Sequence, residues 1–316
     1  MLAGAGSADR LKIGIVLNPA SGRRGKKLFW STLRRAIEAR VTDLSLRETK
    51  GFGDAERFGR ELADDGADLV IAVGGDGTIG EVAGGILKSH RPSTAFSFIA
   101  TGTGCDFARN FSISRDPATI ANRLTSPSVR QIDAGLLTCD DEDGDTVSRH
   151  FANIASFGVS GHIVRAVNEA RNGRRLPGPM VFFFHSLLQI LRYKPRDIRL
   201  RLDGEDIYEG PVTAVAVANG AWFGGGMKVA PDADVADGLF DVVIIRGAGR
   251  LKVITLMNSI YSGGHLKSPL VSIHRARLVE AWPIGKVGVP IDSDGEAPGQ
   301  LPARFEIVAG ALSLRI

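Results

Sequence analysis

The segment at residues 68–88 reads DLVIAVGGDGTIGEVAGGILK. It opens with an almost wholly apolar run, typical of a buried strand, and it closes with the apolar spacing of a helix. Three glycines, Gly74, Gly75 and Gly77, stand between the two. Because they lack Cβ atoms, backbone N–H groups in this turn can approach phosphate oxygens, and the helix N-terminus adds its positive dipole end. The segment predicts a strand, a phosphate-binding turn and a helix.

Asp76 is an acidic residue at a place where a phosphate would bind. Its presence makes sense if the carboxylate holds a magnesium ion or a substrate hydroxyl. The alternative is a plain strand-to-helix turn in which Asp76 caps the helix. The full Gly-Gly-Asp-Gly-Thr pattern, which ends at Thr78, favours the ligand-binding interpretation.

The first third of the chain alternates apolar runs with helical patterns, which indicates a parallel sheet covered by helices on both faces. Turns at residues 18–22 and 101–110 also follow strands, and the carboxyl ends of parallel strands meet at one edge of the sheet. We therefore expect three turns to gather there. The expected strands are residues 11–17, 44–49, 68–73 and 95–100, and the expected helices are residues 26–40, 54–65 and 78–88.

Beyond about Val129 the strands come in neighbouring pairs with hairpin signals, which predicts an antiparallel β-rich domain. The domain prediction is thus 1–128 for an α/β domain and 129–316 for the β-rich domain, whose C-terminal strands could return to the first. The expected strands include residues 198–202, 212–219, 240–246 and two over 304–316, with a hairpin tip at 140–145 and helices at 160–171, 179–193 and 251–261.

The composition is that of an ordinary folded protein: 316 residues, 44% hydrophobic and 23% charged. Cys105 and Cys139 cannot build a disulfide framework or a four-ligand zinc site, so a reducing cytosol fits. Residues 1–10 lack the apolar core of a signal peptide, and the most apolar uninterrupted stretch, 180–184, is far shorter than the ~20 residues of a membrane-spanning helix. We expect a cytoplasmic protein whose membrane contact is peripheral.

Two common nucleotide-binding motifs do not occur in the sequence. No Gly-x-x-x-x-Gly-Lys-Ser/Thr is present, which argues against a P-loop enzyme. No Gly-x-Gly-x-x-Gly follows the first expected strand, which argues against a dinucleotide oxidoreductase.

Motifs spread along nearly the whole chain resemble those of the diacylglycerol kinase-like lipid kinases, which include bacterial lipid kinases and the diacylglycerol, sphingosine and ceramide kinases. The resemblance implies the NAD kinase/diacylglycerol kinase-like fold, with a nucleotide-binding catalytic domain at 1–128, a lipid-binding domain at 129–316 and the active site in the cleft between them. Cys105 stands where many members have Asn, and we interpret it as a small loop residue. The matching motifs are the turn at 18–22, GGDGT at 74–78 with Glu81, GTG at 102–104 with DFAR at 106–109, PDA at 231–233 with DGLFD at 237–241, and DGE at 294–296.

The same resemblance implies a role for individual residues. Glu296 would be the general base that takes the proton from a lipid hydroxyl, and Asp76 would help to organise magnesium and the phosphates. A magnesium ion in the second domain would bind Asp234, Asp237 and the carbonyl of Leu239; hard oxygen ligands suit magnesium. ATP would bind against Asn18, Pro19, Ala20, Ser21, Gly22, Thr49, Gly74, Gly75, Gly77, Thr78, Glu81 and Thr103.

Three further segments have alternative interpretations. The tripeptide Asp-Gly-Glu also occurs at residues 203–205, where it joins two alternating runs and predicts a hairpin turn. The apolar segment 179–193, flanked by basic residues, is either a wall for acyl chains, a membrane-facing helix or an ordinary core helix. The aromatic loop at 222–227 either touches lipid or simply turns between strands.

The favoured function is that of an ATP- and Mg²⁺-dependent lipid kinase that phosphorylates the hydroxyl of diacylglycerol or of a ceramide or sphingoid lipid. One alternative is an NAD kinase or another small-molecule kinase with the GGDGT motif. A second is a non-catalytic, nucleotide-sensing protein that docks on membranes. We expect a membrane lipid and no nucleic acid as partner, and the sequence leaves a homodimer open.

Overall fold

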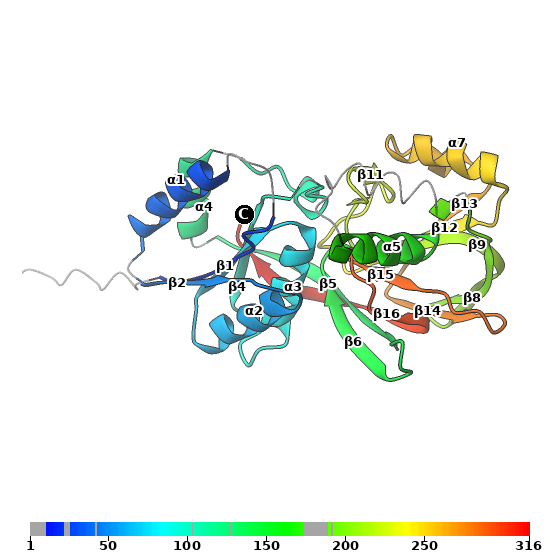
Figure 1. The fold of residues 1–316 in the computed structure, drawn as a ribbon, viewed down its shortest axis with the longest axis horizontal. Helices are drawn as coiled ribbons and strands as arrows, with labels where there is room; N and C mark the ends of the chain where they lie inside the picture. Colours follow the sequence, from blue (N-terminus) through cyan, green and yellow to red (C-terminus); the bar gives the residue numbers. More distant parts are fainter. Residues whose placement is uncertain are drawn as a thin grey trace, which may run out of the picture. The chain divides into compact units, whose positions relative to one another are not determined.

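The computed structural model describes residues 11–21, 26–41, 43–102, 104–114, 116–126, 128–173, 189–190 and 192–316 (Figure 1). The chain forms two compact units. The first comprises Met1–Gly102, Ser112–Gln131 and Leu312–Ile316, and the second comprises Thr103–Phe111 and Ile132–Ala311.

The first unit contains a parallel sheet in the order β2-β1-β3-β4. At its β4 edge, Leu314 from the end of the chain pairs in parallel with Phe96. The predicted parallel sheet is therefore confirmed. The elements of this unit are β1 (Lys12–Leu17), α1 (Lys26–Glu38), β2 (Asp43–Glu48), α2 (Asp54–Asp64), β3 (Leu69–Gly74), α3 (Asp76–Leu87), β4 (Ala95–Ala100) and α4 (Pro117–Thr125).

Helices cover both faces of this sheet, as the apolar strands predict (Figure 1). Side chains alternate across a strand, so Ile13 and Ile15 of β1 share one face and pack in a core with α1 and α4. The intervening Gly14 faces α2, and a Cβ there would lie 2.9 Å from the Leu62 side chain. The fully apolar β3 is buried along its whole length, which holds the turn that follows it on a rigid support.

Glycines let α2 and α3 approach each other closely. A Cβ at Gly85 of α3 would lie 2.1 Å from the carbonyl oxygen of Glu56, a contact between backbone atoms that no side-chain rotation can relieve. We expect Gly85→Ala to destabilise the protein by about 1–3 kcal/mol or more, the usual cost of overpacking. Thermal unfolding should show a lower Tm for this variant, whereas Gly51→Ala, in open space, should unfold like the wild type. An unchanged Tm for Gly85→Ala would contradict the packing of these helices.

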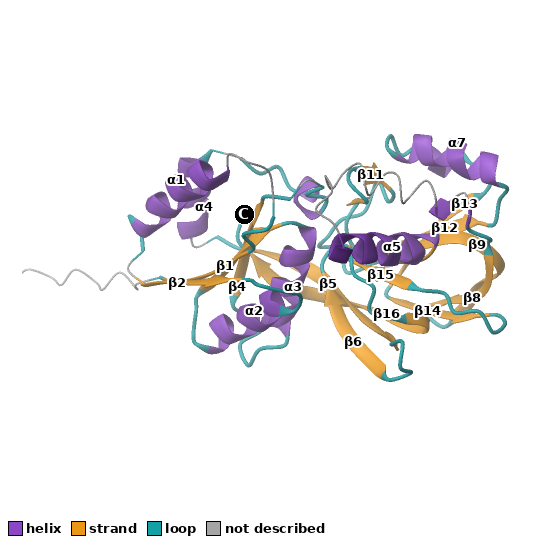
Figure 2. Cartoon of the chain, in the orientation of Figure 1, coloured by secondary structure: helices purple, strands orange, loops and turns teal. Residues whose placement is uncertain are grey.

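The second unit is rich in antiparallel strands (Figure 2), in the order β13-β12-β9-β8-β14-β16, with β7 between β9 and β15 and with β5 paired to β6. Its elements are η1 (Phe107–Asn110), β5 (Arg130–Asp140), β6 (Thr146–Phe151), β7 (Ile154–Gly158), α5 (Val159–Gly173), β8 (Arg196–Leu202), β9 (Glu205–Ala218), β10 (Trp222–Phe223), β11 (Met227–Lys228), β12 (Phe240–Arg246), α7 (Arg250–Ile260), η2 (Gly264–Lys267), β13 (Val271–Ala276), β14 (Leu278–Pro283), β15 (Ile291–Ser293) and β16 (Gln300–Leu314).

The core of the second unit is built around aromatic rings. Phe151 stacks on Phe240 at a centroid distance of 5.7 Å, and Phe157 stacks on Phe305 at 6.0 Å. All four side chains are fully buried, so β6, β7, β12 and β16 are fixed relative to one another. This core supports the turn that follows β15.

The hairpin predicted at residues 203–205 is confirmed. Asp203 and Gly204 both have positive φ angles, and Leu202 pairs with Glu205 across the turn, as a two-residue turn between antiparallel strands requires. The prediction of two strands over 304–316 is wrong, because β16 runs unbroken through Gly310. Gly310 takes a positive φ, and its N–H donates to Asp133 Oδ1 at 2.7 Å, so it bends the strand without ending it.

The predicted helix over 179–193 lies mostly outside the described residues; residues 189, 190 and 192 are helical. Among the helices that the structure describes, none is both long and apolar enough to cross a bilayer.

Candidate functional site

The glycine-rich turn leads directly from β3 into α3. Gly75 is the N-cap in an extended conformation, Asp76 is the first helical residue, and the first helical hydrogen bond runs from Ile79 N–H to the Gly75 carbonyl at 3.0 Å. An α-helix supplies no acceptor of its own for the N–H groups that precede this bond. Together with the helix dipole, this geometry favours an anion at the turn.

The three glycines of this turn differ in how much space a side chain would find. A Cβ at Gly74 would lie 2.4 Å from Thr78 Cβ, so the turn could not close with any larger residue. A Cβ at Gly75 would lie 3.6 Å from Gly102 Cα, at ordinary contact distance. A Cβ at Gly77 would meet no atom of the described residues within 4 Å. The backbone at Gly77 is therefore open to a ligand.

Two neighbouring turns are hydrogen-bonded to this one. Asn18 Nδ2 donates to Thr78 Oγ1 at 3.0 Å, and the Asn18 N–H donates to the Val73 carbonyl at 2.9 Å. Ser21 Oγ lies 3.1 Å from Thr101 Oγ1, and the Thr101 N–H donates to the Gly74 carbonyl at 2.7 Å. Three turns thus meet at one edge of the sheet, as the strand order predicts.

Other residues predicted to contact ATP lie in the turn after β1, directly after β2, and on α3. The Ala20 N–H donates to Asn18 Oδ1 at 3.0 Å, which shapes the first turn around Pro19, and the Thr49 N–H donates to the Leu17 carbonyl at 2.9 Å, which sets Thr49 beside the end of β1. Glu81 Oε2 accepts from the Ala55 N–H at 3.1 Å. Its carboxylate satisfies the start of α2, where the N-cap Gly53 has no side chain to do so. Gly22 and Thr103 lie outside the described residues.

In the second unit, the Asp-Gly-Glu motif forms a tight turn after β15. Asp294 and Gly295 have φ angles of 50° and 88°, and Ser293 and Glu296 exchange backbone hydrogen bonds of 2.9 and 3.0 Å. The Asp294 carboxylate accepts from the N–H groups of Ala152 at 2.7 Å and Ile154 at 2.9 Å. The turn is therefore pinned to the loop between β6 and β7.

The Glu296 carboxylate is largely buried and forms an ion pair. Its Oε2 lies 2.5 Å from Nη1 of Arg149 on β6, and the Glu296 side chain is 14% exposed. This ion pair orients the carboxylate. An oriented, ionised carboxylate is what a general base requires.

The predicted magnesium ligands lie in the loop before β12. Asp234 Oδ1 accepts from the Ala236 N–H at 3.1 Å, Asp237 Oδ1 accepts from the Leu239 N–H at 3.0 Å, and Asp237 Oδ2 pairs with Arg275. Burial raises the pKa of nearby Asp241; Arg275 opposes this rise, and the negative charges of Asp237 and Asp232 add to it.

The donor chemistry of this loop fits magnesium, because carboxylates and a carbonyl are its preferred ligands. Arg275 supplies the positive charge beside Asp237, so a bound ion would share or replace that contact. No group of three His, Cys, Asp or Glu side chains in the described parts of the chain is arranged to hold a metal. Such a site would thus depend on two carboxylates and the backbone.

Several polar residues that we did not single out connect these motifs. Asp106 Oδ2 accepts from the Gly225 N–H at 2.6 Å, and Asn110 Oδ1 accepts from the Ala221 N–H at 2.8 Å. Asn153 links Asn110 Nδ2, at 3.2 Å, to the Trp222 carbonyl, at 2.7 Å. The DFAR segment therefore braces the aromatic loop at 222–227. The only indication of this role in the sequence is that DFAR, residues 106–109, is one of the motifs that resemble those of the family.

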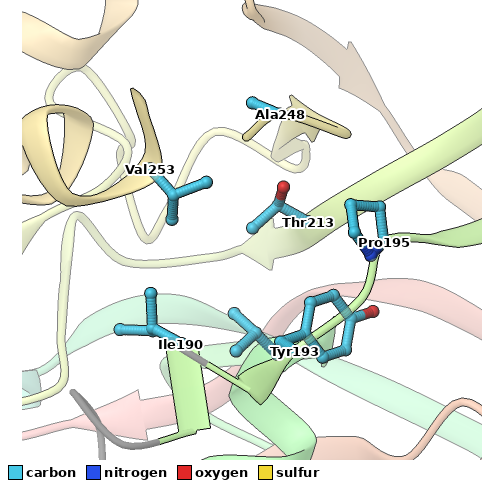
Figure 3. A pocket seen from close by; sticks show the side chains of 7 residues that line it. Ile190, Tyr193, Pro195, Thr213, Ala248 and Val253 are labelled. Carbon is cyan, nitrogen blue, oxygen red and sulfur yellow. The ribbon is translucent and has the colours of Figure 1, made fainter. Parts of the chain in front are cut away.

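An apolar pocket lies in the second unit, between α7, β9 and the segment before β8 (Figure 3). Thr213 Oγ1 donates to the Arg246 carbonyl at 3.1 Å, whereas the Tyr193 hydroxyl has no hydrogen-bond partner among the described residues. Burial raises the pKa of Tyr193 to about 12, so this hydroxyl keeps its proton. The pocket is lined by Val159, Ile190, Tyr193, Pro195, Thr213, Ala248 and Val253.

The fold and the sites define a class: proteins with an α/β unit and an antiparallel β-rich unit, as in the diacylglycerol kinase and NAD kinase folds. Residues 12–137 match the sequence model of the diacylglycerol kinase catalytic domain. Residues 153–316, more than half of the chain, match the YegS C-terminal NAD kinase beta sandwich-like domain. The chain belongs to the diacylglycerol kinase-like lipid kinase family, as its motifs predict.

Curated relatives extend over most of the chain. It is 28% identical over 293 residues to a diacylglycerol kinase of Bacillus subtilis (strain 168), covering 92% of this chain and 91% of the relative. It is 29% identical over 251 residues to a diacylglycerol kinase of Mycobacterium tuberculosis (strain ATCC 25618 / H37Rv), covering 79% and 77%. A probable lipid kinase YegS-like of Xanthomonas oryzae pv. oryzae (strain MAFF 311018) is 28% identical over 299 residues, covering 92% and 94%.

Solved structures show the same fold. A putative diacylglycerol kinase from Bacillus anthracis str. Sterne superposes with a TM-score of 0.74 at 23% identity, covering 96% of both chains. Yeast NADH kinase complexed with NADH superposes with a TM-score of 0.53 at 11% identity, covering 98% of this chain and 81% of the other. At these identities the likeness concerns the fold alone. Membership of a kinase family implies use of a nucleotide.

Proposed function

We propose that this chain is an ATP-dependent lipid kinase that transfers the γ-phosphate to the hydroxyl of diacylglycerol or of a ceramide or sphingoid lipid. The observation that carries this proposal is the set of three hydrogen-bonded turns around the N-terminus of α3, with an open backbone position at Gly77. Family membership supports the lipid acceptor.

In this proposal the nucleotide phosphates bind the N–H groups around Gly75 and Gly77. Asn18 holds Thr78 in place, and the turn at residues 18–22 borders the nucleotide together with Thr49 and Thr103. Glu81 acts through the start of α2, since that is where its carboxylate binds. Asp76 would help to hold magnesium against the phosphates, where the ion would neutralise charge on the transferring group.

Glu296 is the proposed general base. The lipid oxygen forms a bond to the γ-phosphorus, and the bond between the γ-phosphorus and the oxygen that bridges it to the β-phosphate breaks. The hydroxyl proton passes to the Glu296 carboxylate, and ADP leaves. The Asp294 anchor holds the base in place. A second magnesium ion would bind Asp234, Asp237 and the Leu239 carbonyl, where it would rigidify the loop and compensate its negative charge.

We propose that one hydrocarbon chain of the lipid would enter at this pocket (Figure 3) and widen it, because the pocket in this structure has room for about one water molecule. Its walls are apolar, and the Tyr193 hydroxyl is a protonated donor suited to a carbonyl oxygen of the lipid. Arg192 and Lys194, which flank Tyr193 in sequence, are exposed and could contact an anionic bilayer. We therefore propose peripheral membrane contact near this pocket.

Val253→Trp is expected to raise the KM for the lipid and to leave the KM for ATP unchanged, because the indole would fill the pocket. If the indole keeps two methylene groups of the lipid chain out of the pocket, the lost burial, at about 0.8 kcal/mol each, corresponds to roughly a tenfold higher lipid KM. Asn258→Trp places the same ring on an exposed position of α7 and serves as control. Equal lipid KM values for both variants and the wild type would exclude the pocket as a chain site.

A screen with radiolabelled ATP tests the proposed function. Diacylglycerol, ceramide and sphingoid bases are presented in detergent micelles, NAD is tested separately, and products are separated by chromatography. Labelled lipid supports the proposal. Labelled NADP would favour an NAD kinase, and ATP binding without any labelled product would favour a nucleotide-sensing protein.

A further inference from the structure

Asp292 is a buried carboxyl group next to the Asp-Gly-Glu turn to which neither the motif comparison nor the proposed chemistry gives a role. It lies on β15 and is 7% exposed. Its Oδ1 accepts from the Gly295 N–H at 2.9 Å, and its Oδ2 lies 3.2 Å from Ser156 Oγ. Both of these partners are uncharged groups that donate a hydrogen bond to the carboxyl group.

The turn that Asp292 contacts needs support. Asp294 is a non-glycine residue in the left-handed region, which costs about 1–2 kcal/mol unless the surroundings hold it there. Asp294 is pinned from one side by the loop at residues 152–154. The Gly295 peptide is held from the other side by Asp292. The position of Glu296 depends on both contacts.

The strand that carries Asp292 is itself rigidly placed. Asp292 pairs with Ser156 across β15 and β7. A Cβ at Gly161 of α5 would lie 2.1 Å from the Pro290 carbonyl oxygen, so α5 backs this strand at backbone contact. Asp292 therefore has little room to move, and its hydrogen bond fixes the Gly295 peptide.

We infer that Asp292 is a positioning residue for Glu296: its carboxyl group holds the turn, with Oδ1 accepting from the Gly295 N–H and Oδ2 accepting from the Ser156 hydroxyl. This inference rests on the proposed role of Glu296. Burial raises the pKa of Asp292 to about 7, and the Asp294 charge on the same turn adds to that rise, while the Gly295 and Ser156 hydrogen bonds lower it. Of the elements packed around Asp292, β7 places the uncharged Ser156 hydroxyl beside the carboxyl group, and α5 places Gly161 against the strand that carries it.

The sign of the pH effect follows from linkage. In the unfolded chain Asp292 ionises near 3.8, whereas in the folded chain it keeps its proton up to about pH 7. Between these pH values the folded state holds a proton that the unfolded state has released. The free energy of unfolding therefore falls as the pH rises and levels off above pH 7. The amide introduced by Asp292→Asn carries no charge at any pH. The Tm difference between Asp292→Asn and wild type should therefore grow from pH 4 to pH 7 in favour of the variant.

The experiment compares Asp292→Asn and Asp292→Ala with the exposed control Asp206→Asn in the full chain. We expect Asp292→Ala to lower kcat by about 10- to 100-fold, as misplacement of a reacting group does, with the ATP KM within about twofold. Asp292→Asn should keep kcat within about threefold at pH 6 and flatten the activity profile between pH 6 and 8. Hydrogen exchange of the Gly295 amide should accelerate in Asp292→Ala alone.

Wild-type kcat and wild-type exchange in Asp292→Ala would overturn the inference. So would a folded Asp292→Asn that loses as much kcat as Asp292→Ala. If Asp292→Ala does not fold, Asp292→Asn decides: a Tm difference from the wild type that stays constant between pH 4 and pH 7 would overturn the inference. Glu296→Gln is measured in parallel: if it retains turnover, the proposed role of Glu296 fails, and amide exchange still decides whether Asp292 holds the turn.

Discussion

Asp76→Asn is expected to lower lipid phosphorylation on the order of 10³-fold or more. The reason is position: Asp76 is the first residue of α3, beside the backbone that is open at Gly77. Loss of one charge at a helix N-terminus costs only about 0.3–1 kcal/mol of stability. The variant should therefore remain folded by circular dichroism and melt close to the wild type while it forms labelled lipid on the order of 10³-fold more slowly.

Asp116→Asn is the matched control. Asp116 is the N-cap of α4 in the same unit, and its side chain accepts from the Thr119 N–H at 2.8 Å, a bond that Asn can also accept. This variant should phosphorylate lipid at the wild-type rate. Wild-type turnover in Asp76→Asn would remove Asp76 from the reaction and leave it as a helix cap.

Glu296→Gln is expected to lower kcat by about 10²–10⁴-fold, the usual contribution of a general base. Glutamine preserves the shape of the side chain but cannot accept the hydroxyl proton. Because the turn is held through Asp294 and Gly295, the substitution should leave the backbone and ATP binding unchanged. Rapid-quench measurement of labelled lipid and calorimetric titration of ATP give the two readouts.

The chain provides its own control for this substitution. Asp203-Gly204-Glu205 forms the same kind of turn, and Glu205 is exposed. Glu205→Gln should leave kcat unaltered. Equal effects of the two substitutions, or full turnover with Glu296→Gln, would show that the base is another group.

The first unit could be predicted from sequence because β1, β3 and β4 are largely apolar runs and each is followed by a turn that contains glycine. The end of β16 could not be predicted in the same way. Gly310 looks like a break between two strands, and only the distant Asp133 carboxylate, which binds its N–H, explains why the strand continues. A bond over such a separation leaves no local pattern.

The same limit applies to the site. Glu81 stands one turn after the GGDGT motif, yet its carboxylate serves Ala55 on another helix. Arg149 pairs with Glu296, and Ser156 with Asp292, although each pair is far apart in the sequence. These contacts follow from tertiary packing. Sequence motifs indicate which loops contain functional residues. Tertiary packing determines which atoms of those residues can contact a ligand.

The central claim is that the glycine-rich turn at α3 presents ATP for transfer to a lipid hydroxyl. Its most direct test is a single turnover of wild-type protein preloaded with γ-labelled ATP and mixed with micelles of the lipid. The account predicts that the label appears in a lipid phosphate monoester, one per protein molecule. Label that stays in ATP, or that appears only as inorganic phosphate, would contradict it.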